Sequence, residues 1–230
     1  MFTYSLSGLE IKGAGESLQE VEENETTSRS AVYQVLGNWF NITHPAHFTN
    51  SRDGVWIKDL LTASELLPYQ VDFQSDNDTF EIDAEEYGRR WTATFEGNSP
   101  EHSLLQFSTY AIDNTHSTSE VTREYEYFGL SKGESTNLPD DHLSTELEFM
   151  GFICFKEAAT SSDRLRNSYR RAQKDFMTRY VSPVVDGVTS SLADQDMIPP
   201  FQWGLLNLKK YFEQDQRYLE NLLESPGMPG

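Results

Sequence analysis

Basic residues are scarce in this sequence, and the shortage restricts its partners. The chain has 18 Lys and Arg against 37 Asp and Glu, which gives a formal net charge of −19 over 230 residues. A nucleic-acid-binding protein needs a basic surface that neutralises phosphates, and anionic membranes also attract basic segments. The composition therefore argues against nucleic acid and against stable membrane association, and favours a basic partner. A solvated acidic surface, or adaptation to salt, is the alternative explanation of the same charge.

Cysteine and long apolar runs are scarce as well. Cys154 is the single cysteine, so no internal disulfide can form, and this fits a reducing compartment. No stretch approaches the roughly 18 uninterrupted apolar residues that a membrane-spanning helix needs. The first residues lack a basic region followed by an apolar run, so we expect no export signal. These features together predict a cytoplasmic protein.

Motifs for catalysis and cofactor binding are missing too. The sequence contains no GxxxxGK[ST] or GxGxxG phosphate loop and no CxxC pair. His44 and His47 have the spacing of two metal ligands on a helix, but Pro45 interrupts that helix. Glu146 and Glu148 are two residues apart, so on a helix they point in different directions and make a poor acid–base pair. We therefore predict no metal, no bound cofactor and no enzyme activity.

Helical periodicity, by contrast, is present over most of the chain. Apolar side chains recur three and four residues apart, and Ser28 is a suitable N-cap for the first helix. The pattern predicts an all-α, single-domain helical bundle. Its helical regions are expected at residues 28–44, 83–95, 119–130, 142–180 and 200–223.

The segments outside these regions are less regular. Residues 69–82 alternate apolar and polar side chains, which favours a short β-hairpin. Residues 1–27 are polar and rich in glutamate, and we expect a loosely ordered acidic arm there. Residues 97–118 are predicted to be a long polar loop around an apolar patch. The helical domain then covers 28–224, and 225–230 form a tail. The apolar residues that could anchor the arm are Phe2, Tyr4 and Leu6.

Residues 137–158 form the most informative segment. Pro139 ends the element before it, and Asp140 and Asp141 can accept the free N–H groups of a first helical turn. Apolar side chains at helical spacing follow, which predicts a deeply buried helix. An acidic helix end with a histidine, His142, thus opens onto a loop, and this points to a binding site. The alternative is a structural role in which the aspartate caps the helix and the histidine braces a loop.

The same segment resembles the signature of a known family. Leu138–Leu143 reads Leu-Pro-Asp-Asp-His-Leu and is followed by Glu-Leu-Glu-Phe-Met. This is similar to the Leu-Pro-Asp-His-Leu element of the dedicated molybdoenzyme chaperones of the TorD, DmsD and NarJ type. The branch that it most resembles is the delta subunit of ethylbenzene dehydrogenase, dimethylsulfide dehydrogenase, and selenate and chlorate reductases. One Asp is additional here, and Asp141 is favoured for the family position because it directly precedes His142. Arg29–Phe40 and Tyr169–Phe176 resemble further family motifs.

The resemblance implies a cytoplasmic chaperone of the DMSO reductase family of enzymes. Such a chaperone binds the apo catalytic subunit of a molybdopterin oxidoreductase, and its twin-arginine leader, and assists insertion of the molybdenum cofactor before export. Arginine pairs bidentately with carboxylates, and an amphipathic segment lies in a groove between helices. The residues expected to bind the client or its leader are Pro139, Asp140, Asp141, His142, Glu146, Tyr125 and Trp91. For the two aromatic residues, burial in the core is the alternative.

Two other functions stay open at this stage. One is a small hydrolase or nucleotide-binding enzyme that uses Asp141 and His142, and the other is a structural subunit of the mature oxidoreductase. Turnover that is lost in Asp141→Ala with folding intact would favour the enzyme. We expect a monomer or homodimer, and the sequence leaves open the client and the binding of a nucleotide or of the molybdenum cofactor.

Overall fold

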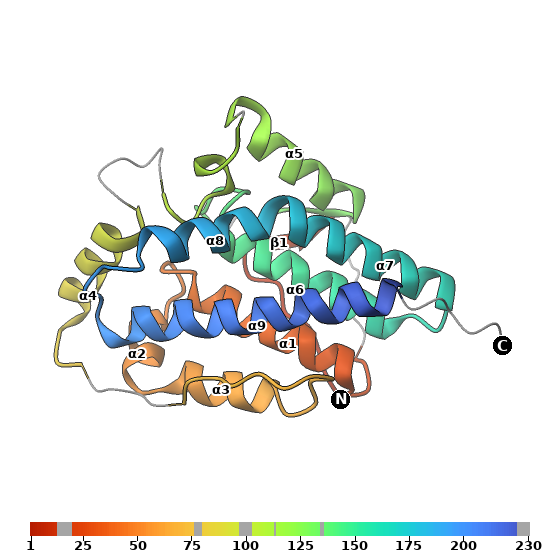
Figure 1. Cartoon of the computed structure of the whole chain (residues 1–230), viewed down its shortest axis with the longest axis horizontal. Coiled ribbons are helices and arrows are strands. Elements are labelled where there is room, and N and C mark those ends of the chain that lie inside the picture. Colours follow the sequence, from red (N-terminus) through yellow and green to blue (C-terminus); the bar gives the residue numbers. More distant parts are fainter. Residues whose placement is uncertain (13–19, 76–79, 97–102, 113, 134–135, 225–230) are drawn as a thin grey trace.

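Helix α6 (Leu143–Ala159) runs through the middle of the molecule in a computed structural model of the chain (Figure 1). The structure describes residues 1–12, 20–75, 80–96, 103–112, 114–133 and 136–224. Helix α1 (Glu25–Trp39) packs against α6 more extensively than any other two described elements pack together. Most side chains of α6 are buried. Its own apolar residues lie on every face of the helix and not in one stripe, as is typical of a helix in the centre of a core.

The remaining described helices surround this pair. They are α2 (His47–Arg52), α3 (Val55–Ala63), α4 (Ala84–Trp91), α5 (Asn114–Tyr127), α7 (Asp163–Phe176), α8 (Ser182–Ser191) and α9 (Pro199–Glu224). Short turns continue or link them: π-helical η1 (Thr92–Glu96) and η3 (Met177–Val181), and 3-10 helical η2 (Phe107–Thr109). In Figure 1, α9 crosses the front, α2 and α3 lie along the lower edge, and α5 lies at the top. The predicted class, a mostly helical single domain, is confirmed.

The only sheet among the described residues is not where the sequence predicted one. Strand β1 (Leu9–Ile11) pairs antiparallel with β2 (Leu130–Lys132). Residues 69–75 and 80–82 form no strand, and 76–79 lie outside the described residues, which corrects the expected hairpin. The chain at Gln74 pairs with α9 instead, because its C=O accepts the indole N–H of Trp203 at 2.7 Å. The alternation of apolar and polar side chains in this segment thus reflects packing against helix α9, not pairing with a second strand.

The first helix begins earlier than the sequence suggested. Asn24 is the N-cap of α1, and its side-chain oxygen accepts the backbone N–H groups of Thr26 and Thr27. The Thr27 hydroxyl in turn accepts the backbone N–H of Asn24 at 2.7 Å, which completes a capping box. Ser28, the predicted cap, donates its hydroxyl to the C=O of Ala63 and so joins α1 to α3.

Part of the segment expected to be loosely ordered packs against α6. Tyr4 is buried, its hydroxyl donates to the C=O of Glu148 at 2.6 Å, and its ring stacks on Phe155. The other expected anchors, Phe2 and Leu6, are partly buried. Successive backbone N–H groups of the arm also donate to the Glu148 carboxylate. They belong to Ser7, Gly8 and Leu9. One charged side chain in α6 therefore supplies the partners that this polar backbone needs.

A buried ion-pair network fixes α1 to three other helices. Arg29 is fully buried, and its guanidinium meets the Asp215 carboxylate through two bonds, with Nε–Oδ1 at 2.5 Å and Nη2–Oδ2 at 3.0 Å. It also contacts Gln173 at 2.7 Å and Glu157 at 3.5 Å. Because every partner is itself buried, removal of one member would leave an uncompensated charge in the core.

Candidate functional site

The predicted site lies where the loop before α6 meets its first turn. His142 is the N-cap of α6, since its Nδ1 accepts the backbone N–H of Ser144 at 3.2 Å. The Ser144 hydroxyl donates to the C=O of Gly37 in α1 at 2.8 Å. A Cβ at Gly37 would lie 3.2 Å from the C=O oxygen of Ser144, so the two helices approach closely here. The capping role expected of Asp140 and Asp141 is therefore corrected, because the next residue performs it.

Asp141 holds a second segment against this junction. Its Oδ2 accepts the backbone N–H of Ser108 at 2.9 Å, and its own C=O accepts the N–H of Phe107 at 2.9 Å. The C=O of Leu105 accepts the N–H of the first residue of α6 at 2.7 Å. Residues 103–110, named the cover segment here, therefore lie across the start of α6. Sequence reasoning missed their role, although the apolar patch within the predicted loop was a signal that they pack.

Asp140 and Tyr125 attach α5 to the same junction. The Thr122 hydroxyl donates to Asp140 Oδ2 at 2.7 Å, and the Tyr125 hydroxyl donates to the C=O of Asp140 at 2.8 Å. Burial, and then the nearby Glu146 carboxyl, raise the pKa of Tyr125 well above its ordinary value, so this phenol remains a donor. Asp140 and Pro139 are partly exposed, and they are the part of the junction that a partner can reach directly.

Glu146 is the least satisfied ionisable side chain at the junction. It is fully buried, and neither carboxyl oxygen has a hydrogen-bond partner among the described residues. Burial, and then repulsion from Asp141, raise its pKa well above the ordinary value. One turn earlier, Nε2 of His142 also lacks a partner among the described residues, and burial lowers the pKa of this ring to about 3. Burial thus favours the neutral form of two polar groups that are four residues apart at one helix end and have unused bonding capacity.

Trp91 belongs to a different part of the core. It is fully buried, and its ring packs against Trp39 at 5.4 Å, Phe95 at 4.5 Å and Phe201 at 5.4 Å between ring centres. Within the described part of the chain, no hydrogen bond or ring contact joins it to residues 139–146. The structure brings the other predicted site residues together and leaves Trp91 out, since the aromatic spacing that singled it out marks a core-facing helix side.

The junction has no geometry for hydrolysis. Asp141 and His142 bind different backbone N–H groups, and no hydrogen bond joins their side chains in the described structure. His44 and His47 also engage the backbone: Nδ1 of His44 accepts the N–H of Ala46, and Nε2 of His47 lies 2.6 Å from the C=O of Trp39. The described residues hold no cluster of three or more potential metal ligands. A buried carboxyl with free oxygens suits a guanidinium partner instead.

No helix among the described residues is long and apolar enough to cross a bilayer.

Comparison with known proteins gives a consistent result. A model of the nitrate reductase delta subunit family matches residues 62–190, which include the cover segment and the whole junction. The perchlorate reductase assembly chaperone protein of Dechloromonas aromatica (strain RCB) is 25% identical over 167 residues, or 69% of this chain and 75% of that protein. The selenate reductase assembly chaperone protein of Thauera selenatis is 39% identical over 64 residues, and the chlorate reductase assembly chaperone protein of Ideonella dechloratans is 34% identical over 64 residues. Each of these two alignments covers 27% of this chain and 33% of the relative.

Proposed function

Because this chain belongs to the nitrate reductase delta subunit family, we propose that it is an assembly chaperone for a molybdenum-containing reductase. The observation that carries the proposal is the family match over residues 62–190. The resemblance noted at Leu138–Leu143 agrees with it, and the similar proteins are named as assembly chaperones of perchlorate, selenate and chlorate reductases. They are named as chaperones and not as enzymes, and we propose no catalytic reaction for this chain.

In this function the protein binds the catalytic subunit of its client before the cofactor is in place. Differential affinity is sufficient: a protein that binds the apo subunit more tightly than the mature subunit keeps the first available for cofactor insertion and releases the second. We further propose that it works in the cytoplasm and that it binds the twin-arginine leader of the client, which delays export until the cofactor has been inserted.

We propose that the client is bound at the α6 junction. Pro139 and Asp140 are partly exposed and available to a client arginine. Asp141 and His142 are positioning residues, because one holds the cover segment and the other caps α6. Glu146 is fully buried and its oxygens are free, so a client guanidinium would reach them only after part of the junction moves, and would then restore the charged form of this carboxyl. Tyr125 braces the same loop, whereas the position of Trp91 favours a core role.

The test is co-expression with the molybdopterin reductase whose gene lies nearest to that of this chain. We expect molybdenum content and reductase activity of the purified client to fall at least severalfold without the chaperone. The chaperone should also co-purify with cofactor-free catalytic subunit more than with mature subunit. Full maturation without the chaperone, together with no binding to the apo subunit, would contradict the proposal.

A further inference from the structure

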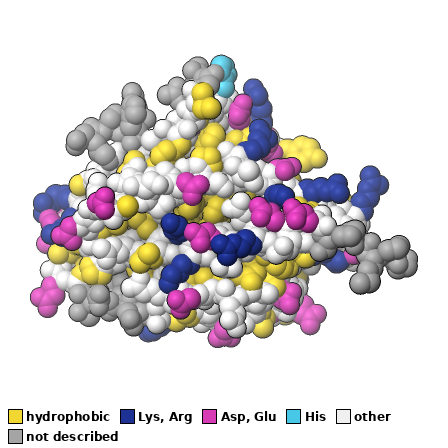
Figure 2. Space-filling view, viewed as in Figure 1, with side chains coloured by type: hydrophobic (Ala, Val, Ile, Leu, Met, Phe, Trp, Pro, Cys, Tyr) yellow, Lys and Arg dark blue, Asp and Glu magenta, His cyan; other side chains and the backbone are white. Residues whose placement is uncertain are grey.

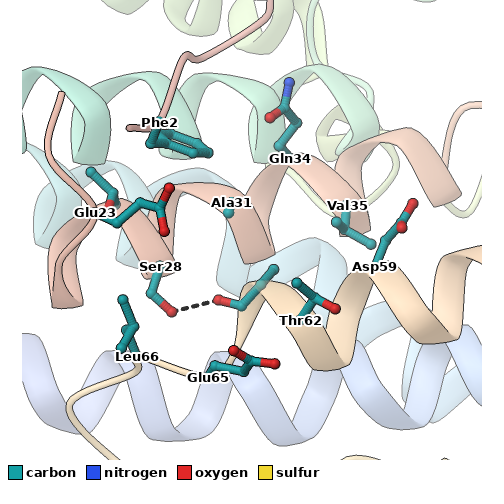
Figure 3. Close-up of a pocket in the computed structure, with 12 residues that line it drawn as sticks. Phe2, Glu23, Ser28, Ala31, Gln34, Val35, Asp59, Thr62, Glu65 and Leu66 are labelled. Atoms are coloured by element: carbon teal, nitrogen blue, oxygen red, sulfur yellow. Dashed lines mark hydrogen bonds between the residues drawn. The ribbon is translucent and has the colours of Figure 1, made fainter. Parts of the chain in front are cut away.

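A groove between α1, α3 and the N-terminal arm has no residue in common with the α6 junction (Figure 3). The cavity has a volume of about 400 Å³. Its apolar surface comes from all three elements. The apolar residues that line it are Phe2, Ala31, Val35, Ala63 and Leu66. The same cavity is lined by the carboxylates of Glu23, Asp59 and Glu65. No Lys or Arg is among the described residues that line it. We name it the α1–α3 groove.

Two of the carboxylates in the α1–α3 groove have unused bonding capacity. No described hydrogen bond or ion pair involves the side-chain carboxylate of Asp59 or of Glu65, and partial burial raises the pKa of Asp59 above its ordinary value. Glu23 is occupied by the ammonium group of Met1 at 2.7 Å. Leu66 is 47% exposed at the edge of the groove. Asp59 and Glu65 are exposed, and their unpaired carboxylates lie beside an apolar surface. A ligand with a cation next to apolar side chains would complement both features.

A second cavity, of about 740 Å³, continues the groove past the start of α1 and shares Glu23 and Leu66 with it. Its cationic side chains are already paired. Arg170 meets Glu157 at 2.6 Å, and Arg166 meets Asp163 at 2.6 Å. The second cavity adds a further carboxylate that is unpaired among the described residues, that of Glu25, so the unpaired charge of the continuous surface is negative throughout.

We propose that the α1–α3 groove docks a short positively charged segment of the client that carries Arg or Lys beside apolar side chains. The stem of an arginine can lie along the apolar floor while its guanidinium reaches the carboxylates of Asp59 and Glu65. The net charge of −19 attracts such a segment from a distance. The proposal rests on the proposed function, because the client supplies the segment. A second contact outside the junction makes binding of the remaining client effectively intramolecular.

Site-specific labelling locates the contact. Cys154 is fully buried and burial raises the pKa of its thiol, so a cysteine introduced at exposed Thr62 is the reactive one. The probe is a synthetic peptide with two adjacent arginines followed by an apolar run, compared with the same peptide carrying glutamine in place of arginine. A fluorophore on Thr62→Cys should respond to the arginine peptide and not to the glutamine peptide. A fluorophore on Ser190→Cys, an exposed position on α8 that lines neither cavity and lies outside the α6 junction, should respond to neither.

The carboxylates are tested by a charge-matched pair of variants. Asp59→Asn/Glu65→Gln should bind the arginine peptide about tenfold more weakly than wild type, as expected for two partly exposed ionic contacts. Glu120→Gln/Asp175→Asn removes the same charge from exposed positions that line neither cavity, and its affinity should stay within about twofold of wild type. Equal affinity of wild type and the groove variant would overturn the proposal, and so would peptide binding without a response at Thr62.

Failure of the groove and failure of the chaperone function give different results. If wild type matures the client but the groove variant binds the peptide normally, the groove proposal is wrong and the function stands. If wild type neither matures the client nor binds its apo subunit, the function itself fails. Circular dichroism of both double variants confirms that they are folded, since the substituted side chains are on the surface.

Discussion

The buried position of Glu146 makes its contribution to the free energy of unfolding depend on pH. Its pKa is raised in the folded protein by burial, and then by Asp141, so the folded state binds more protons than the unfolded chain above the ordinary glutamate pKa. Stability from this group is therefore complete below about pH 4.5 and is lost as the pH rises toward the folded-state pKa. His142 acts in the opposite sense. Its pKa is lowered to about 3, so its contribution is complete above about pH 6.5 and is lost as the pH falls toward 3.

We predict that Glu146→Gln raises the free energy of unfolding at pH 7.5 by about 1 kcal/mol, because the substituted side chain stays neutral in both states. Near pH 4.5 the difference from wild type should largely vanish. Urea unfolding at a series of pH values measures this. A Glu146→Gln protein that is less stable than wild type at pH 7.5 would show that the carboxyl is ionised and paired in the folded state.

A second prediction at the residue scale separates bracing from recognition at the junction. Asp140→Asn/Asp141→Asn keeps side-chain oxygens that can accept the N–H of Ser108 and the hydroxyl of Thr122, but removes the charge. His142→Gln keeps a polar side chain and removes the ring. We expect both variants to melt within a few degrees of wild type, while affinity for the apo client falls about tenfold. Full client maturation by the folded double aspartate variant would mean that the acidic pair is structural.

At the scale of elements, Glu148 links the N-terminal arm to α6. Without its carboxylate, the successive backbone N–H groups of the arm lose their acceptor, and such groups are costly to leave unpaired. We predict that Glu148→Ala lowers the free energy of unfolding by about 2 kcal/mol and abolishes hydrogen-exchange protection at residues 7–9. Glu148→Gln should retain part of the protection.

The matched control lies on the same arm. Lys12 pairs with exposed Glu126 at 2.8 Å, and exposed pairs contribute little to stability. Glu126→Gln should therefore leave both the exchange pattern and the melting temperature almost unchanged. Equal effects of the two substitutions would contradict the view that burial makes Glu148 the anchor of the arm.

At the scale of the whole molecule, acidic and basic side chains are unevenly distributed over the surface. On the face formed by α7, α8 and α9, acidic and basic side chains are interspersed (Figure 2). The α1–α3 groove, in contrast, has only acidic charged side chains among its described lining residues. If the client segment is basic, as we propose, the net charge of −19 should attract it over distances that salt can screen.

We predict that binding of a twin-arginine leader peptide weakens about tenfold or more between roughly 0.1 M and 1 M salt, as the Debye length falls from about 10 Å to about 3 Å. Isothermal titration at both salt concentrations measures the effect. The glutamine version of the peptide serves as the control, because it retains the apolar run. Affinity that does not depend on salt would show that apolar contact alone holds the leader.

The helical class followed from sequence alone, and the sequence also singled out the junction that we propose as the site. Apolar spacing of three and four residues suffices for an amphipathic helix, so the predicted region 142–180 includes both α6 and α7, and 200–223 nearly coincides with α9. The run Leu138–Leu143 singled out the junction. A helix start that combines a proline, two aspartates and a histidine can be recognised from neighbouring residues alone. Both inferences depend on residues that are close together along the chain.

The tertiary structure decided every feature that rests on distant partners. Ser108 is 33 residues from Asp141, so the role of the cover segment was beyond local pattern. The same holds for β1, whose partner β2 lies more than 100 residues away, and for the arm that Glu148 anchors. Trp91 shows the converse, since its helical spacing was correct but its neighbours place it in another cluster. Local spacing fixes which face of an element is apolar, whereas only packing determines which polar group meets which partner.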